Sequence, residues 1–234
     1  IAAVVPSTVV SVFMETIESL NGTLFDAGYQ LMLGQSGYST EREELLLEAI
    51  IGRRPDGIFI TGILPPGKAR TRLLASGIPV VETWDLTPTP IDMLIGFSHS
   101  AIGREVARYL LAKGHRKLAL VRAEDERADR RATAFKETAA QQGCRAVIEA
   151  NVGASRTLKS GREALSRILA QAPDTDAIFC SSDLLALGVM TEAKARGIAI
   201  PEKMAVVGFG DVPFVADMVP ALTSVRINSA DKIG

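Results

Sequence analysis

The chain has 234 residues, of which 47% are hydrophobic and 23% are charged, and its formal net charge is -1. This composition is typical of a globular α/β protein with a large core, and chains of this length commonly split into two lobes. A net charge near zero argues against nucleic-acid binding by this segment, because DNA-binding domains normally carry a clustered basic face.

Short apolar runs rich in β-branched residues alternate with segments of helical period, which predicts parallel strands joined by crossover helices. We expect strands near residues 2–6, 29–34, 57–61, 79–83, 93–97, 117–122, 145–150, 177–181, 204–208 and 222–227. The clearest predicted helices span residues 13–27, 41–53, 101–113, 128–142, 159–171 and 184–196. Ten strands are too many for one sheet in a chain of this length, so the sequence predicts two doubly wound sheets with a boundary near residues 96–103.

Cysteine content and hydropathy bear on the compartment. Cys144 and Cys180 are too few for a disulfide framework, and Cys180 lies in an apolar run, so we expect reduced thiols in a cytoplasmic protein. No run of about 18 apolar residues is present, so no membrane partner is expected. The chain starts at Ile1 inside an apolar run, and we expect it to be a fragment of a longer protein.

Motifs for catalysis and metal binding are poorly represented. Residues 62–69 (GILPPGKA) nearly fit a phosphate-binding loop, but Pro65 and Pro66 have no N–H group and Ala69 has no hydroxyl. His99 and His115 are the two histidines, and neither has a Cys or His at metal-ligand spacing. The sequence therefore favours a binding module, with no catalytic residues, no metal and no cofactor, over an enzyme.

Polar residues at predicted strand ends are the strongest functional signal. In residues 174–211, one strand ends in Ser181-Ser182-Asp183 and the next ends in Gly210-Asp211. Ligands of open parallel sheets bind outside the carboxyl ends of the strands, which is where these residues are expected. Further candidates at strand ends or on the following helices are Ser7, Phe13, Trp84, Ser98, Arg131 and Arg156.

The runs AIFCSSDLLALG and VVGFGD resemble the patterns A-x-F-x-x-[NS]-D-x-x-A-x-G and [IV]-x-G-[FY]-[DG]-D of the LacI/GalR family of bacterial transcriptional regulators. The resemblance covers essentially the whole chain. It implies an α/β fold of two doubly wound parallel-sheet lobes with crossover strands, the periplasmic-binding-protein-like type I core. Residues 1–98 and 227–234 would form the N-terminal lobe and residues 99–226 the C-terminal lobe, with an effector in the cleft between them.

Family contacts can be carried over to single positions. Arg131 in RRATAF matches R-x-x-[GA]-[FW], whose Arg reaches the effector, and Ser182 matches the [NS] of [NS]-D. Trp84 matches a rim position, and Arg156 falls near an aromatic position of the family. Ser98 and Gly210 stand where many members have Asp, which disfavours a neutral sugar. The remaining candidate contacts are Ser7, Phe13 and Asp211.

The runs YSTEREELLLEAIIGRRPDGIFITG and SGIPVVETWDLTPTPIDMLIGFSHSAIGREVARYL resemble the gluconate-operon repressor branch of the family. With two carboxylates replaced and Arg131 retained, the site would favour an anion, so a sugar acid fits better than a sugar. The resemblance implies a homodimer that contacts operator DNA through a helix-turn-helix absent from this chain. Helix 41–53 and the segment 212–218 match dimer faces, through Leu45, Leu46, Ala49 and Ile50 on the helix and through Phe214, Val215 and Met218 on the segment.

Simpler explanations stand beside these. Ser182 is a good helix N-cap, Trp84 can be a packing residue, and Arg127, Arg130 and Arg131 can form a solvated helix face. A solute-binding protein of a sugar transporter shares the fold and is the main functional alternative. A sugar-phosphate or nucleotide enzyme on the same kind of sheet is a third.

Overall fold

The computed structural model describes residues 1–7, 12–144, 146–154 and 156–227, which form two compact units, Ile1–Ser98 and His99–Ile227. The first unit contains β1 (Ala2–Val5), α1 (Val12–Asp26), β2 (Met32–Gln35), α2 (Thr40–Gly52), β3 (Ile58–Thr61), α3 (Lys68–Ser76), β4 (Val80–Thr83) and β5 (Met93–Ile95). The second contains α4 (His99–Ala112), β6 (Leu118–Arg122), α5 (Glu126–Gln141), β7 (Ile148–Asn151), α6 (Leu158–Gln171), β8 (Ala177–Cys180), α7 (Asp183–Ala195), β9 (Ala205–Gly210), the 3₁₀ helix η1 (Pro213–Asp217) and β10 (Thr223–Arg226).

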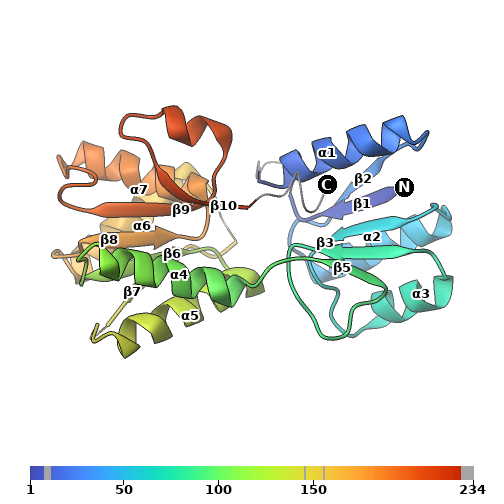
Figure 1. Cartoon of the computed structure of the whole chain (residues 1–234), viewed down its shortest axis with the longest axis horizontal. Helices are drawn as coiled ribbons and strands as arrows, with labels where there is room; N and C mark the ends of the chain where they lie inside the picture. Colours follow the sequence, from blue (N-terminus) through green and yellow to red (C-terminus); the bar gives the residue numbers. More distant parts are fainter. Residues whose placement is uncertain (8–11, 145, 155, 228–234) are drawn as a thin grey trace. The chain divides into compact units, whose positions relative to one another are not determined.

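Each unit is built on one parallel five-stranded sheet (Figure 1). The strand order is β2-β1-β3-β4-β5 in the first unit and β10-β9-β8-β6-β7 in the second. Crossovers between parallel strands are right-handed, so reversing the direction of travel along a sheet moves the helix to the other face. Accordingly α1 lies opposite α2 and α3, and α5 lies opposite α6 and α7 (Figure 1). The predicted fold class is confirmed.

The cores follow from the apolar strands. All four residues of β1, β3 and β8 are buried, as expected for strands covered by helices on both faces. In the first unit, Leu47 and Ile50 of α2 pack with Leu73 of α3 over these strands. In the second, Leu165 and Ile168 belong to the corresponding layer formed by α6 and α7.

Two predicted strands begin three residues later than expected, β7 at Ile148 in place of residue 145 and β2 at Met32 in place of residue 29, and helix capping explains the second shift. The strand expected from residue 29 begins at Met32, because Gly28 has a φ of 81° and the N–H of Tyr29 donates to the carbonyl of Leu24 at 2.8 Å. These contacts end α1 and take Tyr29 out of the strand. The predicted return to the first lobe covered residues 227–234. Ile227 belongs to the second unit, and residues 228–234 lie outside the described residues.

Within the described ranges, no helix is both long enough and apolar enough to cross a membrane.

Candidate functional site

The candidate residues gather at the carboxyl edge of the sheet in each unit. Ser7 follows β1, Trp84 follows β4 and Ser98 lies three residues after β5. In the second unit, Arg156 follows β7, and Ser182 and Asp211 follow β8 and β9. Because all strands of each sheet are parallel, each unit presents its polar residues at a single edge, where small molecules are usually bound.

Arg131 is the most firmly held of these residues. It lies on α5 and is 4% exposed. Its Nη1 is 2.8 Å from Nδ1 of His99, its Nη2 donates to the Ser181 carbonyl at 3.3 Å, and its Cζ lies 4.0 Å from the centroid of the Phe209 ring. The three neighbours come from α4, the end of β8, and β9. The solvated-face alternative is therefore wrong for Arg131, whereas Arg130 pairs with Glu126 on the outer side of α5.

Arg156 is bound to a carboxylate. Its Nη2 donates to Oδ2 of Asp125 at 2.8 Å, and its Nη1 donates to the carbonyl of Ala154 at 3.1 Å. Burial by itself would raise the pKa of Asp125, but the charges of Arg127 and Arg131, the Ala128 N–H and the Arg156 guanidinium together hold that pKa below its ordinary value. Asp125 is thus ionised and sits among three guanidinium groups.

Ser182 and Asp211 have structural partners. Ser182 is the N-cap of α7, with its hydroxyl accepting from the N–H of Leu185 at 3.4 Å. Asp211 pairs with Arg226, and its N–H donates to Oγ of Ser224 at 3.0 Å. Contact of either residue with a ligand stays a prediction.

Asp183, beside this capping residue, joins α7 to the end of β9. Its carboxylate accepts from the N–H of Val212 at 2.9 Å and from the Ser224 hydroxyl. Burial, with the nearby charge of Asp211, raises the pKa of Asp183 despite these hydrogen bonds. Asp183 therefore holds together the loops in which Ser182 and Asp211 lie.

An aromatic cluster occupies the carboxyl edge of the first unit. The indole of Trp84 meets the rings of Phe13 and Phe97 edge to face, with centroids 4.9 and 5.7 Å apart. Trp84 is 2% exposed and has a φ of 67°, a left-handed conformation that is unusual for a bulky residue. Within this unit Trp84 is therefore a packing residue, as the simpler explanation expects. Stacking of its ring on a ligand stays a prediction. Ser7 and Ser98, which follow β1 and β5 at the same edge, are partly buried.

Glu82, which the motif analysis missed, fixes two loops at this edge. It is fully buried, and its carboxylate accepts from the N–H groups of Leu64 at 2.9 Å and Ile91 at 2.7 Å. Arg70 lies 3.6 Å from Glu82 and also donates to the carbonyls of Leu64 and Thr89. The signal was present in the sequence, since an acid inside the apolar strand VVET needs buried partners. Residues 62–69, which nearly fit the phosphate-binding motif, therefore form a loop with a structural role.

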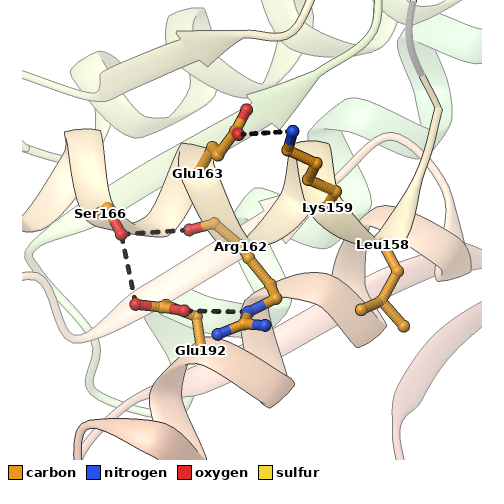
Figure 2. A pocket seen from close by; sticks show the side chains of 6 residues that line it. All are labelled: Leu158, Lys159, Arg162, Glu163, Ser166 and Glu192. Carbon is orange, nitrogen blue, oxygen red and sulfur yellow. Dashed lines mark hydrogen bonds and ion pairs between the residues drawn. The ribbon is translucent and has the colours of Figure 1, made fainter.

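Two of the hollows in the described part of the second unit lie away from the carboxyl ends of its strands. One, of about 490 Å³, lies over α6 and α7 (Figure 2). There Glu192 accepts from Nε of Arg162 at 3.0 Å and is near Oγ of Ser166, while Leu158 stands at the rim. The other, of about 600 Å³, is lined by residues of α7 and of the loops that follow α7 and η1, including Met190, Ile198, Met218 and Val219.

Comparisons with known proteins agree with this architecture. Residues 107–233 match the family model described as a periplasmic binding protein-like domain. The HTH-type transcriptional regulator GntR of Pseudomonas aeruginosa is 34% identical over 97% of this chain. The crystal structure of transcription regulator GntR from Chromobacterium violaceum is 34% identical, with a TM-score of 0.92 over 99% of this chain and 86% of that one. A LacI family transcriptional regulator from Silicibacter pomeroyi is 32% identical, with a TM-score of 0.90 over 98% of this chain and 87% of that one.

The chain belongs to the LacI family of transcriptional regulators. The resemblance inferred from the strand-end motifs is thereby confirmed, and the solute-binding alternative is not favoured because these relatives are regulators. The chain spans 66% of the length of the Pseudomonas aeruginosa GntR and 68% of the Escherichia coli one. It corresponds to the ligand-binding part of a LacI-type regulator.

Proposed function

We propose that this chain is the effector-sensing domain of a LacI-type transcriptional repressor and that its effector is a sugar acid. The observation that supports an anionic effector is the charge balance around Asp125. The guanidinium groups of Arg127, Arg131 and Arg156 act on this one carboxylate, which leaves a local positive surplus around Asp125. A ligand carboxylate would balance that surplus through charge-assisted hydrogen bonds.

Gluconate is the first ligand to test, because the sequence resembles the gluconate-operon repressor branch. In this proposal Arg131 anchors the carboxylate, and Ser98, Ser182 and Trp84 are candidates to contact the hydroxylated chain. Ser7, Phe13, Arg156 and Asp211 complete the candidate set. No catalytic step is proposed for these residues.

The test compares ligand-induced stabilisation by gluconate and by glucose. A ligand at 100 times its Kd adds about 2.7 kcal/mol to the stability of the protein that binds it. For a chain of this size we expect gluconate to raise Tm by several degrees and neutral glucose to raise it much less. Equal shifts with the two compounds, or no shift with gluconate, would contradict the proposal.

Variants on α5 provide the matched control. Arg131→Ala should abolish the gluconate shift, whereas Arg130→Ala, on the outer side of the same helix, should leave it unchanged. Arg131 is buried, so its loss should also lower the Tm of the unliganded protein. The decisive quantity is therefore the shift of each variant relative to its own unliganded state, and a retained shift in Arg131→Ala would exclude Arg131 as the anchor.

We further propose that the whole regulator is a homodimer and that operator DNA is bound by a helix-turn-helix outside these 234 residues. A pseudo-palindromic operator requires two DNA-reading heads, which a two-fold dimer supplies. Effector binding would then alter the spacing of the heads.

A further inference from the structure

The hydrogen bond between Arg131 and His99 defines the protonation state of the histidine. Every N–H group of a guanidinium is a donor, so Nδ1 of His99 must accept the bond from Nη1 at 2.8 Å. His99 is therefore a neutral imidazole whose proton is on Nε2.

The surroundings of His99 favour this neutral form. The side chain is 2% exposed, and its residue is the first of α4, where the helix dipole is positive. The Arg131 charge lies in contact, and Arg127 and Arg156 stand near Asp125 beyond it. While Nη1 of Arg131 donates to Nδ1, the lone pair of that nitrogen is occupied and is not free for a second proton.

We propose that His99 is a positioning residue, whose neutral imidazole holds Arg131 in the orientation that receives the carboxylate of the effector. This inference rests on the proposed function. Two of the contacts that hold Arg131, the Ser181 carbonyl and the Phe209 ring, lie at β8 and β9. The bond from α4 adds a third contact to the guanidinium, made by an element other than these two strands.

The orientation matters because a carboxylate is bound by two parallel N–H groups in one plane. An arginine that is already fixed loses less side-chain entropy when the anion binds. His99 therefore acts on affinity through Arg131, by preorganisation, without needing to touch the ligand itself.

The affinity experiment uses two substitutions that separate the acceptor from the packing. His99→Leu fills similar space and has no acceptor, whereas His99→Asn places an amide oxygen as many bonds from the backbone as Nδ1. We expect His99→Leu to weaken gluconate binding about tenfold by calorimetry and His99→Asn to remain within about threefold of the wild type. Unchanged affinity in His99→Leu, or equal losses in the two variants, would overturn the proposal.

A second measurement needs no ligand. The sequence contains two histidines, so long-range ¹H–¹⁵N spectra with a His115→Gln variant for assignment can identify the tautomer of His99. We expect the Nε2–H form near neutral pH and slowly exchanging Arg131 guanidinium N–H signals that exchange faster in His99→Leu. A protonated Nδ1, or Arg131 signals unaffected by the substitution, would overturn the positioning role. If the wild type binds no gluconate, the proposed ligand is wrong and these spectra alone decide the role of His99.

Discussion

Asp125 makes two contacts with one partly buried carboxylate. Its Oδ1 accepts from the Ala128 N–H at 2.8 Å and caps α5, while its Oδ2 accepts from Arg156 at the same distance. Because these partners and the nearby Arg127 and Arg131 lower its pKa in the folded protein, the ionised form contributes stability above the ordinary value of 3.8. That contribution is lost as the pH falls from about 4 through the lower folded value.

Asp125→Asn should retain the cap and remove the charge that Arg156 requires. We expect a loss of about 1–3 kcal/mol in the free energy of unfolding at pH 7, measured by urea denaturation. The difference from wild type should shrink as the pH falls below about 4, because wild-type Asp125 becomes protonated as the pH passes its lowered pKa. Asp26→Asn, at the exposed end of α1, should change little at either pH, and a difference for Asp125→Asn that is constant with pH would contradict the prediction.

At the scale of single residues, motifs singled out two arginines but not the residues that hold them. Arg131 and Arg156 stood out in the sequence, yet His99 and Asp125 lie 32 and 31 residues away from them and are brought into contact by the fold. The alternative of a solvated helix face, where a charge run usually lies, is wrong for Arg131 because this residue is buried. One available signal was the position of Asp125 just before a helix, where acids often cap.

Helix pairs in the second unit approach closely at glycines. A Cβ atom on Gly103 of α4 would lie 2.1 Å from the carbonyl oxygen of Arg131 on α5. On the other face, Gly161 of α6 and Gly188 of α7 meet in the same way. These contacts leave no room for a methyl group, so the α4 backbone fixes the position of α5 at the residue that we propose as the anchor.

Gly103→Ala should therefore destabilise the protein by about 1–3 kcal/mol and lower its affinity for gluconate, because α5 must move at Arg131. Gly22→Ala is the matched control, since Gly22 lies within α1 with open space around its Cα. There alanine should stabilise by about 0.5–1 kcal/mol through its helix propensity. Chemical denaturation and calorimetry measure both effects, and a neutral Gly103→Ala would show that α4 and α5 can separate at no cost.

The elements themselves were largely predictable, because apolar runs and helical periods repeat with little ambiguity. The predicted start of β2 was too early, because the first residues assigned to it belong to the cap of α1. Helix α3 was not among the clearest helices, because it buries just Ala69 and Leu73 in nine residues. The sites of close helix contact could not be predicted, because nothing in the local sequence distinguishes Gly103 from Gly22.

At the scale of the whole molecule, the apolar surface indicates where a second copy would bind. Leu45 on α2 is 62% exposed, and Phe214 and Val219 in the second unit are 54% and 92% exposed. The predicted dimer faces need correction at Ile50 and Val215, which are buried in their own units. Both had been placed on the surface because helical period alone does not tell which side of a segment meets the core.

The proposed dimer predicts that the chain sediments as a dimer at micromolar concentration. Large exposed apolar groups are usually covered in an interface, and Val219 itself lines the hollow of about 600 Å³ in the second unit. Combined Phe214→Glu and Val219→Glu substitutions should shift the equilibrium to monomer, because two buried charges would lack partners.

Leu74→Glu, which alters a 56% exposed leucine on α3, is the control and should leave the sedimentation coefficient unchanged. If the double variant sediments as the wild type does while Leu74→Glu dissociates, the interface includes α3 and does not include Phe214 and Val219. A wild-type chain that remains monomeric at high concentration would exclude self-association through these 234 residues, and the homodimer would then require parts of the regulator beyond them.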